Sequence, residues 1–258
     1  MFELDPSIII LLITFGFIAA FIDSVVGGGG LITLPALMFT GLSPSAAIAT
    51  NKLASSLGSF TSSIMFFRSG HLDLKTLGKL LPVTFIGSVL GAYVVSIVDP
   101  EILKPVMLVM LAVVAVYTIF KKDWGSISQE KTLSAMHFTL FILLIGFIGF
   151  YDGFLGPGTG SFLMFAFLWI GFDFLKAAGN AKVLNFGSNF AALIMFIILG
   201  QVNFAYGLIM GVAQIFGSIA GSRFAIKRGS GYVRILFIVM TVLLLAKHSW
   251  DYFQSLTS

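Results

Sequence analysis

Long apolar runs separated by short polar stretches dominate the chain. A helix needs about 20 apolar residues to cross the roughly 30 Å hydrocarbon core of a membrane. Runs of this length cover residues 7–26, 45–67, 75–98, 101–120, 136–155, 174–199, 203–226 and 231–250. We therefore predict an all-α, polytopic transmembrane helical bundle in which these segments are full-length spans.

Two shorter apolar segments, 31–41 and 160–171, each follow a glycine-rich break. The first break is the run of four glycines at 27–30, and the second has the sequence GPGTG at 156–160. Segments this short suit half-helices that either cross or re-enter the membrane. With them, the expected number of helices rises to about ten.

The two breaks belong to an internal duplication. Asp23 recurs 129 positions later as Asp152, and after one inserted residue Lys52 recurs 130 positions later as Lys182. The matches concentrate at Gly, Asp and Lys rather than at interchangeable aliphatic residues. We divide the chain into a first transmembrane repeat, a cytoplasmic inter-repeat loop and a second transmembrane repeat, at residues 7–120, 121–135 and 136–250.

Charged residues indicate how the repeats are oriented. Cytoplasmic loops of membrane proteins collect Lys and Arg, and such residues gather here at 68–79, 121–131 and 223–234. If the short segments cross, each repeat has five crossings, the repeats are inverted, and all three basic stretches face the cytoplasm. If the short segments re-enter, eight crossings give parallel repeats. The charge pattern favours the inverted arrangement.

Composition supports a membrane protein and excludes several other classes. Of the 258 residues, 58% are hydrophobic and 10% are charged, whereas soluble domains carry about 25% charged residues. The chain has no Cys and three His, which argues against a zinc, haem or iron–sulfur centre. The net charge of +4 comes from scattered residues. We expect no enzymatic activity, no cofactor, no metal site and no nucleic-acid partner.

The glycine-rich breaks are the strongest candidate site. Irregular backbone at membrane depth persists only where protein or water satisfies its polar groups. The helices that follow the breaks would direct free N–H groups and positive dipole ends at a cavity, which suits an anion. Close helix packing is the alternative, and it is our interpretation of the pairs Gly87/Gly91 and Gly217/Gly221. The substrate-binding candidates at the breaks are Gly27, Gly28, Gly29, Gly30, Thr33, Gly156, Gly158, Thr159, Gly160 and Ser161.

Lys52 and Lys182, at matched positions, lie inside predicted membrane helices. An intramembrane charge is costly and indicates a functional site by default, and a cation here would attract an anionic substrate. Alternatively, the lysines are neutralised by Asp152 and Asp23 in buried pairs, or they extend to the lipid headgroups. Polar residues of the same and nearby helices complete the substrate-binding candidates: Thr50, Asn51, Asn180, Asn185 and Gln214.

Asp23 and Asp152 are matched carboxylates that precede the two breaks. They could carry coupling protons, as intramembrane acids do in transporters. They could equally cap the broken backbone by accepting hydrogen bonds from its N–H groups. We therefore assign them a coupling or structural role and leave the choice open.

Three segments resemble a known family. Residues 21–35 (FIDSVVGGGGLITLP), 49–53 (ATNKL) and 149–157 (GFYDGFLGP) are similar, in this order and at these separations, to the TauE/SafE family of membrane transporters. The likeness is closest to its bacterial YfcA-like branch and covers nearly the whole chain. It implies a duplicated transmembrane unit in the bacterial inner membrane that transports sulfite, sulfoacetate or related sulfonates.

We expect a secondary transporter that exports a small sulfur-containing anion, such as sulfite or an organosulfonate. The anion would bind between the breaks and the two lysines, near the middle of the membrane. The expected partners are this small anionic substrate and the lipid bilayer, and a homodimer is compatible with the sequence. Two alternatives stay open: an anion channel that uses the same site, and a transporter of another small organic anion.

Overall fold

The computed structural model describes residues 5–99 and 135–229, and within these ranges the chain is helical, with no β-strand. The helices are α1 (Pro6–Val26), α2 (Gly30–Phe39), α3 (Pro44–Arg68), α4 (Leu74–Ile97), α6 (Ala135–Phe154), α7 (Thr159–Trp169), α8 (Phe174–Ile198) and a last helix, Phe204–Gly229. Their bounds agree with the predicted segments to within a few residues. The predicted spans 101–120 and 231–250, and the inter-repeat loop up to residue 134, lie outside the described residues.

Five of these helices, α1, α4, α6, α8 and the last helix, are long and apolar enough to cross a membrane. α3 has the length, at 25 residues, but is rich in Ser and Thr. Its side chains at Ser56, Ser59 and Ser62 are buried within the bundle, so protein rather than lipid surrounds them. The described part of the chain is therefore a multi-pass helical bundle with a polar helix inside it.

Polar side chains determine where the helices begin. The Ser43 hydroxyl accepts a hydrogen bond from the amide of Ala46 at 3.3 Å before α3. At the matched position before α8, Asp173 Oδ1 accepts from the amides of Leu175 and Lys176 at 2.9 Å. Such caps satisfy amide groups that have no partner in the first turn of a helix.

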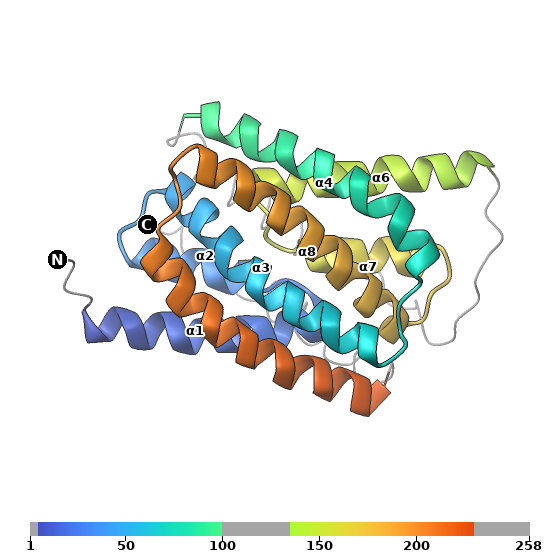
Figure 1. Cartoon of the computed structure of the whole chain (residues 1–258), viewed down its shortest axis with the longest axis horizontal. Coiled ribbons are helices and arrows are strands. Elements are labelled where there is room, and N and C mark those ends of the chain that lie inside the picture. Colours follow the sequence, from blue (N-terminus) through green and yellow to red (C-terminus); the bar gives the residue numbers. More distant parts are fainter. Residues whose placement is uncertain (1–4, 100–134, 230–258) are drawn as a thin grey trace, which may run out of the picture.

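The glycine-rich breaks turn the chain back into the bundle. α2 has ten residues and rises only about 15 Å, roughly half of a membrane core. Because only residues 40–43 connect α2 to α3, α2 leads back to the end of the bundle from which α1 enters (Figure 1). α6, α7 and α8 follow the same course from the other end.

Matched helices of the two halves run in opposite directions in Figure 1. α1 and α3 run from left to right, α6 and α8 run from right to left, and α4 is likewise opposed to the last helix. The end of α3, the start of α4 and the end of the last helix lie together on the right. The described basic residues in and beside these segments are Arg68, Lys75, Lys79, Arg223, Lys227 and Arg228.

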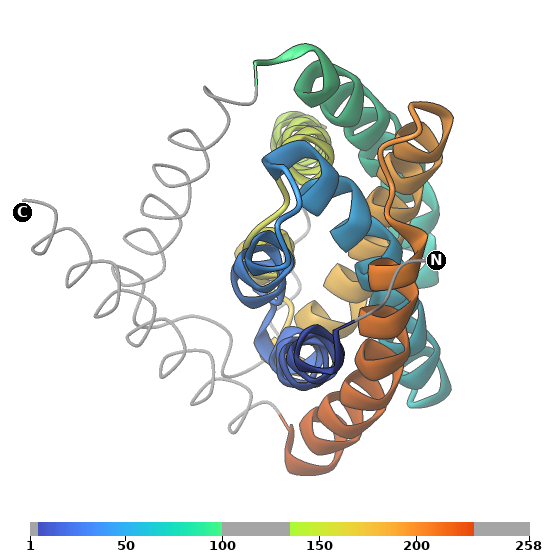
Figure 2. The ribbon, with the colours of Figure 1, turned by 90° about the vertical axis from the view of Figure 1, so that its left-hand side faces the viewer.

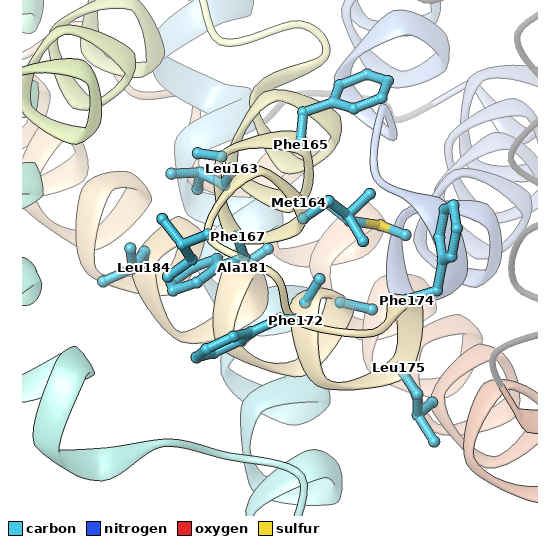
Figure 3. Packing of buried hydrophobic residues seen from close by; sticks show 14 of the residues in the cluster. Leu163, Met164, Phe165, Phe167, Phe172, Phe174, Leu175, Ala181 and Leu184 are labelled. Carbon is cyan, nitrogen blue, oxygen red and sulfur yellow. The ribbon is translucent and has the colours of Figure 1, made fainter. Parts of the chain in front are cut away.

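α7 and α8 form much of the apolar core. Phe167 of α7 packs beside Ala181 and Leu184 of α8 (Figure 3), and the ring of Phe141 in α6 lies 5.9 Å from that of Phe167, centroid to centroid. Viewed along the bundle, α1 and α6 are nearly end-on, whereas α4 and the last helix cross it at a tilt (Figure 2). This packing holds α7, and the break that precedes it, against the long helix α8.

The paired glycines outside the breaks allow helices to touch through their backbones. A Cβ atom on Gly91 of α4 would lie 2.0 Å from the carbonyl oxygen of Phe150 in α6. At the matched position, a Cβ on Gly221 would lie 2.3 Å from the carbonyl oxygen of Phe21 in α1. The close-packing interpretation of these glycines is confirmed.

Adding a methyl group at Gly91 should therefore force α4 and α6 apart. We expect Gly91→Ala to lower the free energy of unfolding by about 1–3 kcal/mol, the usual cost of overpacking. The effect is measured by thermal unfolding in detergent, with the folded fraction determined by size-exclusion chromatography after heating. Gly78→Ala is the matched control, because Gly78 lies on the same helix with open space around its Cβ position. Equal stability of both variants would contradict the close α4–α6 contact.

Candidate functional site

Two buried ion pairs connect the halves of the protein. Lys52 is the ninth residue of α3 and Lys182 is the ninth residue of α8, so each lies about 12 Å from the start of its helix. Lys52 Nζ is 3.0 Å from Asp152 Oδ1, and Lys182 Nζ is 2.6 Å from Asp23 Oδ2. Each lysine is thus neutralised by the aspartate of the other half. Of the alternatives for the two lysines, the structure contains the buried pairs.

The two ion pairs differ in their surroundings. The Asp152 side chain is 2% exposed, and its second oxygen accepts a hydrogen bond from the Ser188 hydroxyl at 2.5 Å. Lys52 Nζ also donates to the backbone carbonyl of Asp152. The Asp23 side chain is 20% exposed, and its other oxygen accepts from the amide of Gly29 at 3.0 Å. Asp23 therefore caps the first break, while Asp152 is enclosed by protein.

The two breaks meet each other, which explains several of their glycines. A Cβ atom on Gly27 would lie 2.2 Å from the amide nitrogen of Ser161, and one on Gly156 would lie 2.7 Å from Lys52 Nζ. The Ser161 hydroxyl also donates to the carbonyl of Val26 at 3.0 Å. Larger residues would separate the breaks or displace an ion pair. From the sequence, we expected these glycines to leave the backbone open for a ligand. The structure adds a steric reason for them, namely the close contact between the two breaks.

Several amide groups of the breaks remain open. In the described part of the chain, no hydrogen-bond acceptor faces the amides of Gly28, Gly30, Gly158 or Gly160. These amides lie at the starts of α2 and α7, where the helix dipoles are positive. The breaks therefore present donors to whatever occupies the space beside them.

A polar cavity lies against the breaks. Its lining includes these predicted residues: Asp23, Gly28, Gly29, Gly30, Thr33, Asn51, Lys52, Asp152, Gly156, Gly158, Thr159, Gly160, Asn185 and Gln214. Four further residues line it that the sequence did not single out: Ala19, Ala20, Ser55 and Asn189. Ser55 and Asn189 each lie one helical turn from a predicted residue, Asn51 and Asn185 respectively, so helical periodicity could have found them.

Gln214 of the last helix lines this cavity and carries a donor without a partner. Its side chain amide nitrogen is buried and has no hydrogen-bond partner in the described structure, and the residue is 4% exposed. A buried polar group without a partner is costly and calls for an explanation such as an absent ligand or water. Gln214 also lines the cavity, which is therefore the place where such a ligand or water would lie.

Five predicted residues do not line the cavity: Gly27, Thr50, Ser161, Asn180 and Lys182. The Thr50 hydroxyl accepts from the amide of Asn203, and Asn180 Oδ1 accepts from the amide of Asp73, both at 3.0 Å. Thr50 and Asn180 are matched positions, and each fixes a loop of the opposite half. Lys182 lies just behind the lining, because a Cβ on Gly160 would approach its Nζ to 3.0 Å.

The charges and donors of the cavity limit what it can do chemically. The charges of the two ammonium groups and the two carboxylates cancel. The groups that remain to bind a ligand are therefore neutral, namely backbone amides and polar side chains. Within the described residues, no group of three His, Cys, Asp or Glu side chains is arranged to hold a metal ion. A polar cavity between broken helices inside a multi-pass bundle is the arrangement of a membrane transport protein.

Comparisons with known proteins identify the family. A family model described as "Sulfite exporter TauE/SafE" matches residues 12–248. The chain is 38% identical to the probable membrane transporter protein ORF9 of a Sinorhizobium species, over 95% of this chain and 93% of that relative. It is 37% identical to a probable membrane transporter protein of Haemophilus influenzae, over 96% and 97%. It is 35% identical to the probable membrane transporter protein YfcA of Escherichia coli K12, over 97% and 93%.

The chain belongs to the TauE/SafE family of membrane transporters, as its three motifs indicated. The resemblance to the YfcA-like branch is confirmed by these relatives, whose names describe transporters rather than enzymes. No solved structure matches the chain.

The buried pair between Lys52 and Asp152 should show strong thermodynamic coupling. Removing one partner of a buried pair leaves an uncompensated charge and costs about 3–5 kcal/mol, whereas replacing both partners is often nearly neutral. We expect Lys52→Met to be strongly destabilised and Lys52→Met/Asp152→Leu to recover most of the loss, measured by thermal unfolding in detergent. Additive effects, with coupling below about 0.5 kcal/mol, would show that the two side chains do not interact.

Proposed function

We propose that the protein is a secondary transporter that exports a small sulfur-containing anion, such as sulfite or an organosulfonate, across the bacterial inner membrane. The observation that carries this proposal is the cavity lined by both breaks, whose amides are open, and by Gln214, whose amide nitrogen has no partner. The family description names sulfite export, and a sulfonate or sulfite group offers three acceptor oxygens to these donors.

The balance of donors and acceptors supports an anion rather than a cation. The carboxylates of Asp23 and Asp152 are already bonded to lysines, so they offer little to a cation. The open amides and the positive dipole ends of α2 and α7 favour a negative group. Lys52 and Lys182 are likewise paired, so the open amides are the donors left for the anion.

We also infer that the halves form an inverted repeat, with alternating access produced by the exchange of their near-equivalent conformations. The opposed directions of the matched helices (Figure 1) and the crossed ion pairs support this inference. The basic residues in and beside the end of α3, the start of α4 and the end of the last helix lie toward one end of the bundle, and we assign this end to the cytoplasm.

A gradient or the membrane potential would drive such a transporter. The sequence has no Gly-Lys-Ser/Thr phosphate loop for ATP. A membrane potential that is negative inside favours the exit of an anion that crosses with net negative charge, and for such a substrate this favours export over uptake.

Flux into proteoliposomes tests the proposed function. We expect saturable flux of at least one of sulfite, sulfoacetate, taurine and sulfate. Gln214→Leu should reduce that flux at least tenfold without loss of stability, because it removes a donor that has no protein partner. Ser222→Ala is the matched control: Ser222 is also buried without a partner but does not line the cavity.

Each outcome has a distinct meaning. No flux of any of these solutes, with folded protein in the vesicles, would refute the proposed substrate class. Flux that rises without saturation and needs no counter-ion would favour a channel. Full flux in Gln214→Leu would remove this residue from the binding site.

Cysteine labelling tests the inverted repeat, and the absence of Cys from the sequence makes every introduced thiol unique. Ser69 directly follows α3 and Leu199 directly follows α8, at matched positions. A membrane-impermeant maleimide added to whole cells should label Leu199→Cys and leave Ser69→Cys unlabelled until the membrane is opened. Labelling of both variants from the same side would show parallel repeats.

A further inference from the structure

The two matched aspartates are not equivalent, although the sequence gives them the same place in each repeat. Both line the cavity, but the Asp23 side chain is 20% exposed and the Asp152 side chain is 2% exposed. Ser188 donates to Asp152 at 2.5 Å, and the position matched to Ser188 in the first half is Gly58, which has no side chain to donate. Water and ions entering the cavity can therefore reach Asp23 far more readily than Asp152.

The two lysines differ in the same sense. An ammonium group carries three N–H donors. Lys52 uses them on both a side-chain and a backbone oxygen of Asp152. Lys182 has one hydrogen-bond partner in the described structure, Asp23 Oδ2. Lys182 therefore keeps donors for a second acceptor. Gly160, which lies between Lys182 Nζ and the cavity, has no side chain, so only its backbone separates the two.

Few other ionisable groups face Asp23. α2 and α7 contain none, and α3 contributes Lys52, which is bonded to Asp152. α8 contributes Lys182 itself. The ionisable residues of the last helix, namely Tyr206, Arg223, Lys227 and Arg228, do not line the cavity. The other charged residues of the lining, Lys52 and Asp152, are bonded to each other, so Lys182 behind the lining is the cation that balances Asp23.

We propose that Asp23 is the proton-carrying residue of the transport cycle, and that the substrate anion and Asp23 compete for Lys182. When the anion enters, it takes the place of the Asp23 carboxylate as the counter-charge of Lys182. Asp23, having lost its cation, accepts one proton from water at Oδ2 and becomes neutral. When the anion leaves, Asp23 releases that proton and re-forms its bond to Lys182.

This exchange moves one proton with each anion. Before binding, the charges of Lys182 and Asp23 sum to zero. After binding, the ammonium, the neutral acid and a singly charged anion also sum to zero, whereas a doubly charged anion such as sulfoacetate leaves one net negative charge. Asp152 keeps its partners in this exchange, because Lys52 and Ser188 each hold one of its oxygens.

The assignment of Asp23 rests on the proposed function, and the test separates the two. Infrared difference spectra of the purified full chain, acidified without any substrate, report which buried carboxyl group takes up a proton first. We expect a protonated-carboxyl band that disappears in Asp23→Asn and persists in Asp152→Asn. A band that disappears in Asp152→Asn instead, or persists in both variants, would overturn the assignment whatever the substrate is.

Transport provides the second readout, with sulfoacetate as the probe because it stays fully ionised near neutral pH and brings no proton of its own. In vesicles containing a pH-sensitive dye, wild-type flux should carry protons, and sulfoacetate affinity should rise by up to tenfold per unit decrease in pH. In Asp23→Asn both the proton flux and the pH dependence should fall at least tenfold. Sulfoacetate flux with full proton movement in Asp23→Asn would refute the inference and leave the transporter function intact. Absence of sulfoacetate flux together with the expected infrared result would refute that substrate and leave the proton site intact.

Discussion

The exchange of counter-charges between the two halves is the constraint on which this structure depends. A lysine placed about 12 Å inside a membrane helix is tolerated only when an opposite charge satisfies it. Lys52 finds that charge on Asp152 and Lys182 finds it on Asp23, each in the other half of the chain. Neither half can therefore bury its own lysine alone, and both breaks must lie together for the pairs to form.

The remaining features of the site follow from this arrangement. Glycines at 27, 156 and 160 leave room for the opposite break and for the lysine ammonium groups. Because aspartates rather than a ligand neutralise the lysines, the open donors of the cavity are backbone amides and Gln214. Asp23, Lys52 and Asp152 line the same cavity, so the contact between the halves and the cavity share these residues.

Much of this architecture could be predicted from the sequence, because length and apolar runs determine helices and glycine runs interrupt them. The bounds of the described helices, the two breaks and the matched Lys and Asp residues were all foreseen. Which aspartate pairs with which lysine was left open, because pairing across the halves is a tertiary contact. Thr50 and Asn180 proved to bind loop amides of the opposite half, a role that depends on how the halves meet. Ser188 was missed, because its matched position is a glycine and the repeat pattern therefore gave no signal.

The crossed ion pairs can be measured directly by solid-state NMR of the protein in lipid, with 15N-labelled lysine and 13C-labelled aspartate. The Asp23→Asn and Asp152→Asn variants assign the signals. We expect strong dipolar coupling from Lys52 Nζ to the carboxyl carbon of Asp152 and from Lys182 Nζ to that of Asp23, as the 3.0 and 2.6 Å contacts require. Coupling of Lys52 to Asp23, or of neither lysine to any aspartate, would contradict the account.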